Sequence, residues 1–95
     1  MKLKVVVSVE AAEQLDHQLG YLAEAGALKA AEGLRLRVLH FLEQHLAFYP
    51  KTGRYLSQRD LWETWIPGTK LVIWYRLEND RLFVVSVWHT AQDRN

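Results

Sequence analysis

The hydrophobic residues change their spacing once along the chain, at Pro50, and this change limits the folds that the chain can adopt. Before Pro50 the leucines recur at the spacing of an α-helix, and after it the apolar residues occur in short runs typical of β-strands. Segregated helices and strands predict the α+β class. We therefore expect a helical hairpin packed on a C-terminal antiparallel meander.

Two helices are expected before Pro50. Leu15, Leu19 and Leu22 lie at helical spacing between residues 10 and 25, and Gly26 is typical of the residue that ends a helix. A second helix is expected over residues 27–48, and the short joint at Gly26 predicts an antiparallel hairpin. Two neighbouring rows should form its wide apolar face: Leu34, Val38, Phe41, His45 and Phe48, and Leu28, Arg35, Leu39, Leu42 and Leu46.

Four strands are expected. Residues 2–9 are rich in valine and predict a buried N-terminal strand, whose partner the pattern does not determine. Residues 61–66, 69–77 and 82–89 predict the meander, with turns at residues 67–68 and 78–80. Strict alternation in the last strand would place Leu82, Val84, Ser86 and Trp88 on one face, and Phe83, Val85, Val87 and His89 on the other. Both faces are mostly apolar, so this strand should be central.

Composition excludes several classes of protein. The 95 residues suffice for one domain, which we expect to cover residues 1–95, and they include 49% hydrophobic and 24% charged residues, as in ordinary globular proteins. The chain has no cysteine, so disulfides and thiolate metal sites are excluded. No apolar run is long enough for a signal peptide or a membrane span, and we expect a cytoplasmic protein.

The charges and histidines indicate neither a nucleic-acid footprint nor a metal site. The net charge is +1, so we expect no direct sequence-specific binding to nucleic acid. His17, His40 and His45 lie on the expected helices without the spacing of a shared metal site. We expect no metal and no other cofactor.

Three segments carry a resemblance to a known family. In order along the chain they are residues 49–54 with 58–61 (YPKTGR and QRDL), residues 72–80 (VIWYRLEND) and residues 87–94 (VWHTAQDR). Following a helical hairpin, these segments resemble the ParE branch of the RelE/ParE toxin superfamily over nearly the whole chain. The chain departs from the usual pattern in having Asp60 where a glutamate is common, and Asp93-Arg94 where the order Arg-Asp is common.

The resemblance implies the toxin of a bacterial toxin–antitoxin pair. Its partner would be a small antitoxin whose disordered segment folds across the toxin, against the helical hairpin and the edge of the sheet. ParE-like members act on DNA gyrase and trap it with broken DNA, whereas RelE-like members cut messenger RNA in the ribosome. A member that binds its antitoxin but has lost its toxicity would have the same sequence pattern.

The residues favour binding to gyrase over cleavage of RNA. A metal-free ribonuclease needs an acid, a base and cations that stabilise the phosphorane. His89 could supply the proton transfer, with Arg76 and Arg59 as the cations. Where such nucleases carry an arginine on the first meander strand, however, this chain has Glu63, which would repel phosphate. We therefore expect no catalytic residues, and keep the ribosome-dependent endonuclease as the alternative.

Candidate partner-binding residues follow from this interpretation. Exposed aromatic and arginine side chains are the usual anchors of protein interfaces. The candidates are Arg54, Arg59, Arg76, Trp88, His89 and Arg94, with Leu15, Leu19 and Leu22 for the antitoxin. Most of them also have a purely structural interpretation. The leucines and tryptophans could be core, His89 a hydrogen-bonded histidine, and Arg76 an ion-pair partner of Glu63. Arg54 and Arg59 could brace the loop by donating to backbone carbonyls.

Overall fold

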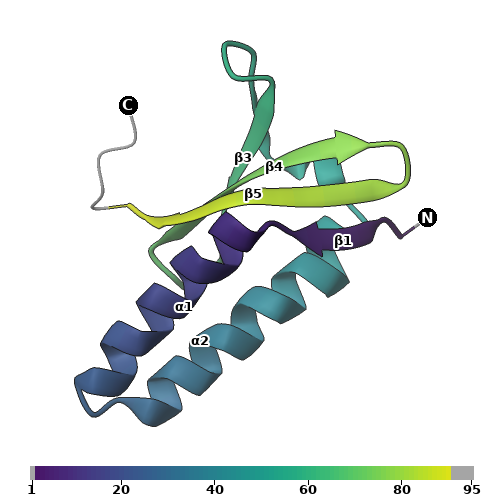
Figure 1. The fold of residues 1–95 in the computed structure, drawn as a ribbon. Coiled ribbons are helices and arrows are strands. Elements are labelled where there is room, and N and C mark those ends of the chain that lie inside the picture. The colour runs from purple at the N-terminus through teal and green to yellow at the C-terminus, as the bar shows by residue number, and fades with distance from the viewer. Residues whose placement is uncertain (1, 91–95) are drawn as a thin grey trace.

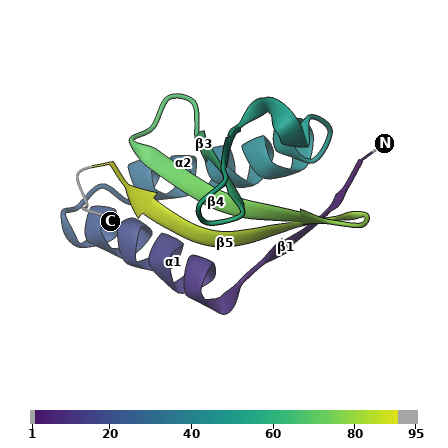
Figure 2. The same cartoon turned by 90° about the horizontal axis from the view of Figure 1, so that it is seen from above.

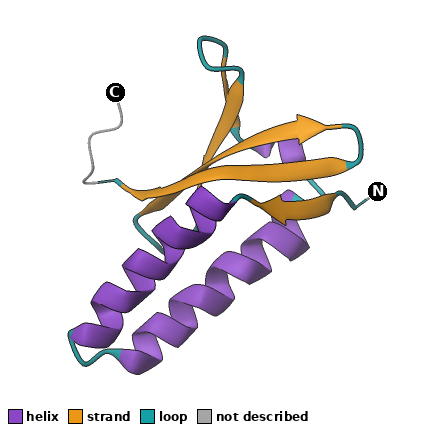
Figure 3. Cartoon of the chain, viewed as in Figure 1, coloured by secondary structure: helices purple, strands orange, loops and turns teal. Residues whose placement is uncertain are grey.

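The computed structural model describes residues 2–90, and these form the α+β fold that the sequence predicts (Figures 1 and 3). The elements, in chain order, are β1 (Lys4–Val7), α1 (Val9–Glu24), α2 (Leu28–Phe41), a π-helical turn (Leu42–Leu46), a 3-10 turn (Pro50–Thr52), β2 (Arg54–Leu56), β3 (Leu61–Trp65), β4 (Leu71–Glu78) and β5 (Arg81–His89). The two long helices lie side by side on one face of the sheet, and the joint between them projects away from it (Figures 1 and 2).

The sheet has the strand order β1-β5-β4-β3-β2. β5 is central, as predicted, because it lies between β4 and the parallel strand β1. The prediction of a buried N-terminal strand is wrong: β1 is an edge strand, and its residues are exposed or half-buried. The short strand β2, which pairs with β3, was not predicted, since its segment carries loop residues on both sides.

Ser8 joins β1 to α1 and explains why the helix begins there. Its hydroxyl oxygen accepts a 3.0 Å hydrogen bond from the amide of Ala11, which satisfies one of the free donors of the first turn. The same hydroxyl donates to the carbonyl of Val85 on β5 at 3.0 Å. The predicted end of the helix is also confirmed, because Gly26 follows α1 with a φ of +82°.

The second helix is shorter than predicted. Regular α-helix ends at Phe41, and the π-helical turn absorbs an extra residue before Pro50. This turn rotates the apolar rows, so that Leu42 and Leu46 are buried in the core while His45 and Phe48 are exposed. The predicted row that joined Phe41, His45 and Phe48 on the buried face is therefore wrong beyond Phe41.

A bulge in β5 changes which residues share a face. Trp74 pairs with Ser86, but the next residue of β4, Tyr75, pairs with Val84, so Val85 is the extra residue. Beyond the bulge the alternation is reversed. Leu82 and Val84 therefore share the helix side with Val87 and His89, whereas Phe83 shares the opposite side with Ser86 and Trp88, and the predicted faces of this strand are wrong.

Candidate functional site

The side of the sheet that faces away from the helices carries four of the nine predicted partner-binding residues: Arg54, Arg59, Arg76 and Trp88. We call this the outer face, and define it by residues that pair across neighbouring strands: Arg54, Glu63, Trp65, Val72, Trp74, Arg76, Glu78 and Trp88. Ser86, next to the bulge, is buried and donates a hydrogen bond to Gln14 of α1. The helix side of β4 instead contributes Leu71, Ile73 and Tyr75 to the core. The outer face thus combines arginines with tryptophans on rigid strands.

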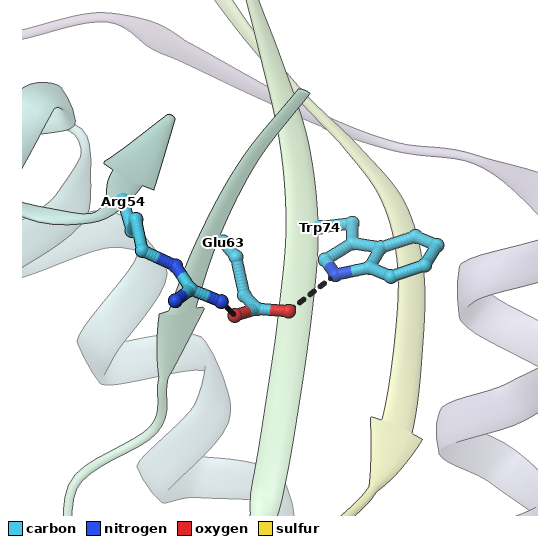
Figure 4. Close-up of polar contacts among 3 residues, drawn as sticks. All are labelled: Arg54, Glu63 and Trp74. Atoms are coloured by element: carbon cyan, nitrogen blue, oxygen red, sulfur yellow. Dashed lines mark hydrogen bonds and ion pairs between the residues drawn. The ribbon is translucent and has the colours of Figure 1, made fainter. Parts of the chain in front are cut away.

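Glu63 lies at the centre of the outer face and holds two neighbours in place (Figure 4). One carboxylate oxygen accepts a 2.9 Å bond from Nη2 of Arg54, and the other accepts a 2.8 Å bond from the indole Nε1 of Trp74. The Glu63 side chain is 15% exposed, whereas that of Arg54 is 75% exposed. The carboxylate that would repel phosphate is therefore engaged in fixing the tryptophan and one arginine.

Arg59 reaches from the β2–β3 loop over the ring of Trp74. Its guanidinium carbon lies 4.9 Å from the ring centroid, within the range of a cation–π contact. The Trp74 ring also meets Trp88 edge to face at 5.8 Å. The structure therefore brings together Arg54, Arg59 and Trp88, which the sequence had singled out separately.

Arg76 is exposed on the outer face, opposite Phe83 of β5. The predicted ion pair between Arg76 and Glu63 is wrong: Glu63 binds Arg54 and Trp74 instead. Within residues 2–90, neither Arg76 nor Arg59 makes an ion pair. Arg94 lies outside the described residues.

His89 lies on the opposite side of the sheet. It pairs with Leu71 and lines a groove of about 780 Å³ between the helical hairpin and the ends of β4 and β5. The other residues that line it are Gln18, Tyr21, Leu22, Ala30, Gly33, Leu34, Arg37, Gly68, Thr69, Lys70 and Leu71. The structure does not bring His89 together with Arg59 and Arg76.

The groove is largely apolar, with cations at one side. Arg37 donates a 3.0 Å hydrogen bond to the carbonyl of Gly68, which holds its guanidinium beside the β3–β4 turn. Tyr21 is 72% exposed, although tyrosine is a large and partly apolar residue. Of the leucines proposed for the antitoxin, Leu22 lines the groove, whereas Leu15 packs against the core and Leu19 is half-buried.

The described part of the chain contains neither a candidate metal site nor a candidate membrane-spanning helix. Residues 2–90 contain no group of three or more His, Asp or Glu side chains that could hold a metal ion. Over the same residues, no helix has the length and apolar character needed to cross a bilayer.

Comparison with known proteins decides the family. The family described as "ParE toxin of type II toxin-antitoxin system, parDE" matches residues 5–94. The chain belongs to this ParE toxin family. Among solved structures, the chain is similar to one described as "Chromosomal ParDE TA system from P. aeruginosa", with a TM-score of 0.68, 13% identity, and coverage of 93% of this chain and 96% of that one. Curated protein sequences give no match.

Membership of the ParE family makes this protein the toxin of a type II toxin–antitoxin system and implies an antitoxin partner. Three residues of this ParE-like chain were missed as site residues: Glu63 as the support of Trp74, and Arg37 and Tyr21 in the groove. Tyr21 directly precedes Leu22 in α1, and an aromatic residue beside the leucine row is the one signal in the sequence that could have indicated a surface there. Nothing in the sequence indicated that Arg37 would reach Gly68.

Proposed function

We propose that this ParE-family toxin acts in the bacterial cytoplasm by binding DNA gyrase and blocking its cycle, and that an antitoxin neutralises it by occupying the groove beside His89. Gyrase as the target comes from the resemblance to ParE-like toxins. The single observation that supports binding over RNA cleavage is that His89 and the outer-face arginines lie on opposite sides of the sheet.

The separation of these groups counts against the endonuclease. Cleavage at a 2′-hydroxyl needs an acid–base group and phosphate-binding cations within hydrogen-bond reach of the same atoms. A sheet lies between the imidazole of His89 and the guanidinium of Arg59, so both cannot contact one phosphate. Arg37 and Lys70 do share the groove with His89, but apolar side chains such as Leu22 and Leu34 form most of its wall.

The same groove has the properties expected of a site for a peptide helix. Apolar helices dock into grooves of this kind through side chains at helical spacing. Tyr21 and Leu22 from α1 face the groove with Leu34 from α2, and Lys70 and Arg37 could meet acidic residues of the antitoxin. The antitoxin would thus bind on the helix side and place its acidic groups near the start of β4.

A comparison of DNA and RNA damage tests the proposal. The toxin is expressed alone in bacteria, and purified toxin is added separately to gyrase supercoiling reactions and to translating ribosomes. Gyrase inhibition predicts filamentous cells, DNA breaks and loss of supercoiling, with transcripts intact. His89→Ala should retain this activity, since the imidazole lies away from the outer face.

Codon-specific cleavage of transcripts on ribosomes, abolished by His89→Ala or Arg37→Ala, would overturn the proposal in favour of the endonuclease. A toxin that binds its antitoxin but affects neither gyrase nor transcripts would identify a family member without toxicity. Calorimetric titration with the purified antitoxin separates that case from misfolding.

A further inference from the structure

Some charged side chains of the outer face form ion pairs or hydrogen bonds within the fold, and others do not. Its central carboxylate, Glu63, is shared between Arg54 and the indole of Trp74. Arg59 and Arg76 lie on the same face without an ion-pair partner among residues 2–90. Asp60 and Glu78 line a hollow together with Arg76. Within residues 2–90 neither carboxylate forms an ion pair with Arg76 or Arg59, so both cations can still be bound by a partner.

One of these cations is held in a defined position. Stacking over Trp74 at 4.9 Å restricts the guanidinium of Arg59, and Trp74 is itself fixed by its bond to Glu63 and by contact with Trp88. A side chain that is ordered before binding loses less conformational entropy when a partner arrives. Arginine and tryptophan at the centre of a patch are the residue types that contribute most to protein interfaces.

We propose that the outer face binds an acidic segment of a partner protein, with Arg59 and Arg76 contacting its carboxylates beside the Trp74–Trp88 pair. The inference rests on the proposed function only in taking the target to be a protein. The occupant is chosen by charge complementarity, because carboxylates would neutralise two arginines that form no ion pair within residues 2–90. Planar guanidinium groups also bind carboxylates in a bidentate manner.

Trp65 is exposed on the outer face, but around Trp74 a nucleic acid fits the surface less well than an acidic peptide does. Bases bind to proteins by stacking on open aromatic faces. Here Arg59 covers the ring of Trp74, and the edge-to-face contact with Trp88 further restricts access to it. The Glu63 carboxylate between the arginines would also repel a phosphate backbone, whereas a peptide can place an apolar side chain or a hydrogen-bond donor there.

The direct test uses a short oligoglutamate peptide as the probe and tryptophan fluorescence as the readout, because two of the tryptophans lie at the proposed contact. Wild type should show saturable binding that weakens as salt is raised, since exposed charges are screened. Arg59→Glu and Arg76→Glu should each weaken binding by about tenfold or more, because reversed charges repel the peptide. Lys29→Glu, an exposed cation of α2, should leave binding unchanged.

Three results would overturn the inference: no binding of oligoglutamate by the wild-type protein, equal binding by Arg59→Glu, or tighter binding of a single-stranded oligonucleotide of the same charge. Circular dichroism and antitoxin binding establish that each variant is folded. Gyrase inhibition is then measured separately with the same variants. Failure of the wild type to inhibit gyrase would refute the proposed target, whereas the peptide titration tests the surface whatever the target is.

Discussion

The hydroxyl of Tyr75 donates a 2.6 Å hydrogen bond to the carbonyl of Pro50 and so ties the core of β4 to the loop that leads into β2. Tyr75 is fully buried, and Arg54 lies just beyond this loop on the outer face. The bond therefore links the packing of the core to the position of an outer-face arginine.

We predict that the burial of Tyr75 makes the stability of the fold decrease at alkaline pH. Burial raises the pKa of Tyr75 from 10.0 to about 12, partly opposed by a hydrogen bond from the Gly53 backbone. The unfolded chain thus ionises first, so the stabilisation is complete below pH 10 and is lost as the pH rises towards 12. Urea unfolding over this range should show a decline in the free energy of unfolding that Tyr75→Phe reduces. Because Tyr75→Phe also loses the hydrogen bond to Pro50, this variant should be less stable by about 1 kcal/mol at neutral pH.

Tyr55→Phe is the matched control for this measurement. The pKa of Tyr55 is also raised, chiefly because its hydroxyl donates to Asp60, but its side chain is exposed. Its removal should alter the alkaline decline less than Tyr75→Phe does. An equal effect of the two substitutions would show that burial of Tyr75 does not cause the decline.

Gly53 lies in the same loop as Pro50, and the space around its Cα is restricted by Tyr75 and Glu63. A Cβ placed there would lie 2.5 Å from the Tyr75 hydroxyl and 2.6 Å from the backbone oxygen of Glu63. We predict that Gly53→Ala destabilises the fold by about 1–3 kcal/mol, the usual cost of overpacking. Adding Tyr75→Phe should restore only part of the loss in thermal unfolding, because the backbone oxygen remains. Full recovery in the double variant would contradict this account.

Local chemistry explains which parts of the fold the sequence could predict. The sequence indicated correctly that Gly26 follows the first helix and that the strands begin after Pro50, because glycine and proline impose local backbone requirements. The π-helical turn and the β5 bulge each absorb one extra residue, and tertiary packing decides where that happens. The periodicity of the hydrophobic residues does not show where such an extra residue is inserted.

The bulge also explains why the candidate site was predicted only in part. With strict alternation, His89 would lie on the outer face and Trp88 on the helix side. The extra residue at Val85 exchanges the two, so the aromatic ring joins Trp74 and the imidazole joins the groove. A one-residue shift thus separates the components of a nuclease that the sequence had allowed to converge.

Ser8 provides a prediction for the junction between β1 and α1. Its hydroxyl both caps the helix and donates to the Val85 carbonyl at the bulge. Ser8→Ala should therefore cost about 1–2 kcal/mol in urea unfolding, the typical value for a lost helix cap. Ser57→Ala, at an exposed turn, is the control and should change stability little. A loss no larger than that of the control would show that neither bond contributes.

Gly33 tests the position of the antitoxin. It lies within α2 and lines the groove, yet no atom lies within 4 Å of a Cβ built there. Because glycine weakens a helix interior, Gly33→Ala should stabilise the toxin by about 0.5–1 kcal/mol in thermal unfolding. Gly33→Phe should instead project a ring into the groove and weaken antitoxin binding in calorimetric titration.

Gly20 gives the matched control, since it lies within α1, has equally open surroundings and does not line the groove. Gly20→Ala should stabilise the toxin similarly, and Gly20→Phe should leave antitoxin binding intact. If Gly33→Phe binds the antitoxin as tightly as the wild type does, the antitoxin does not occupy the groove beside His89. The proposed mode of neutralisation would then be wrong, while the assignment to the ParE family would stand.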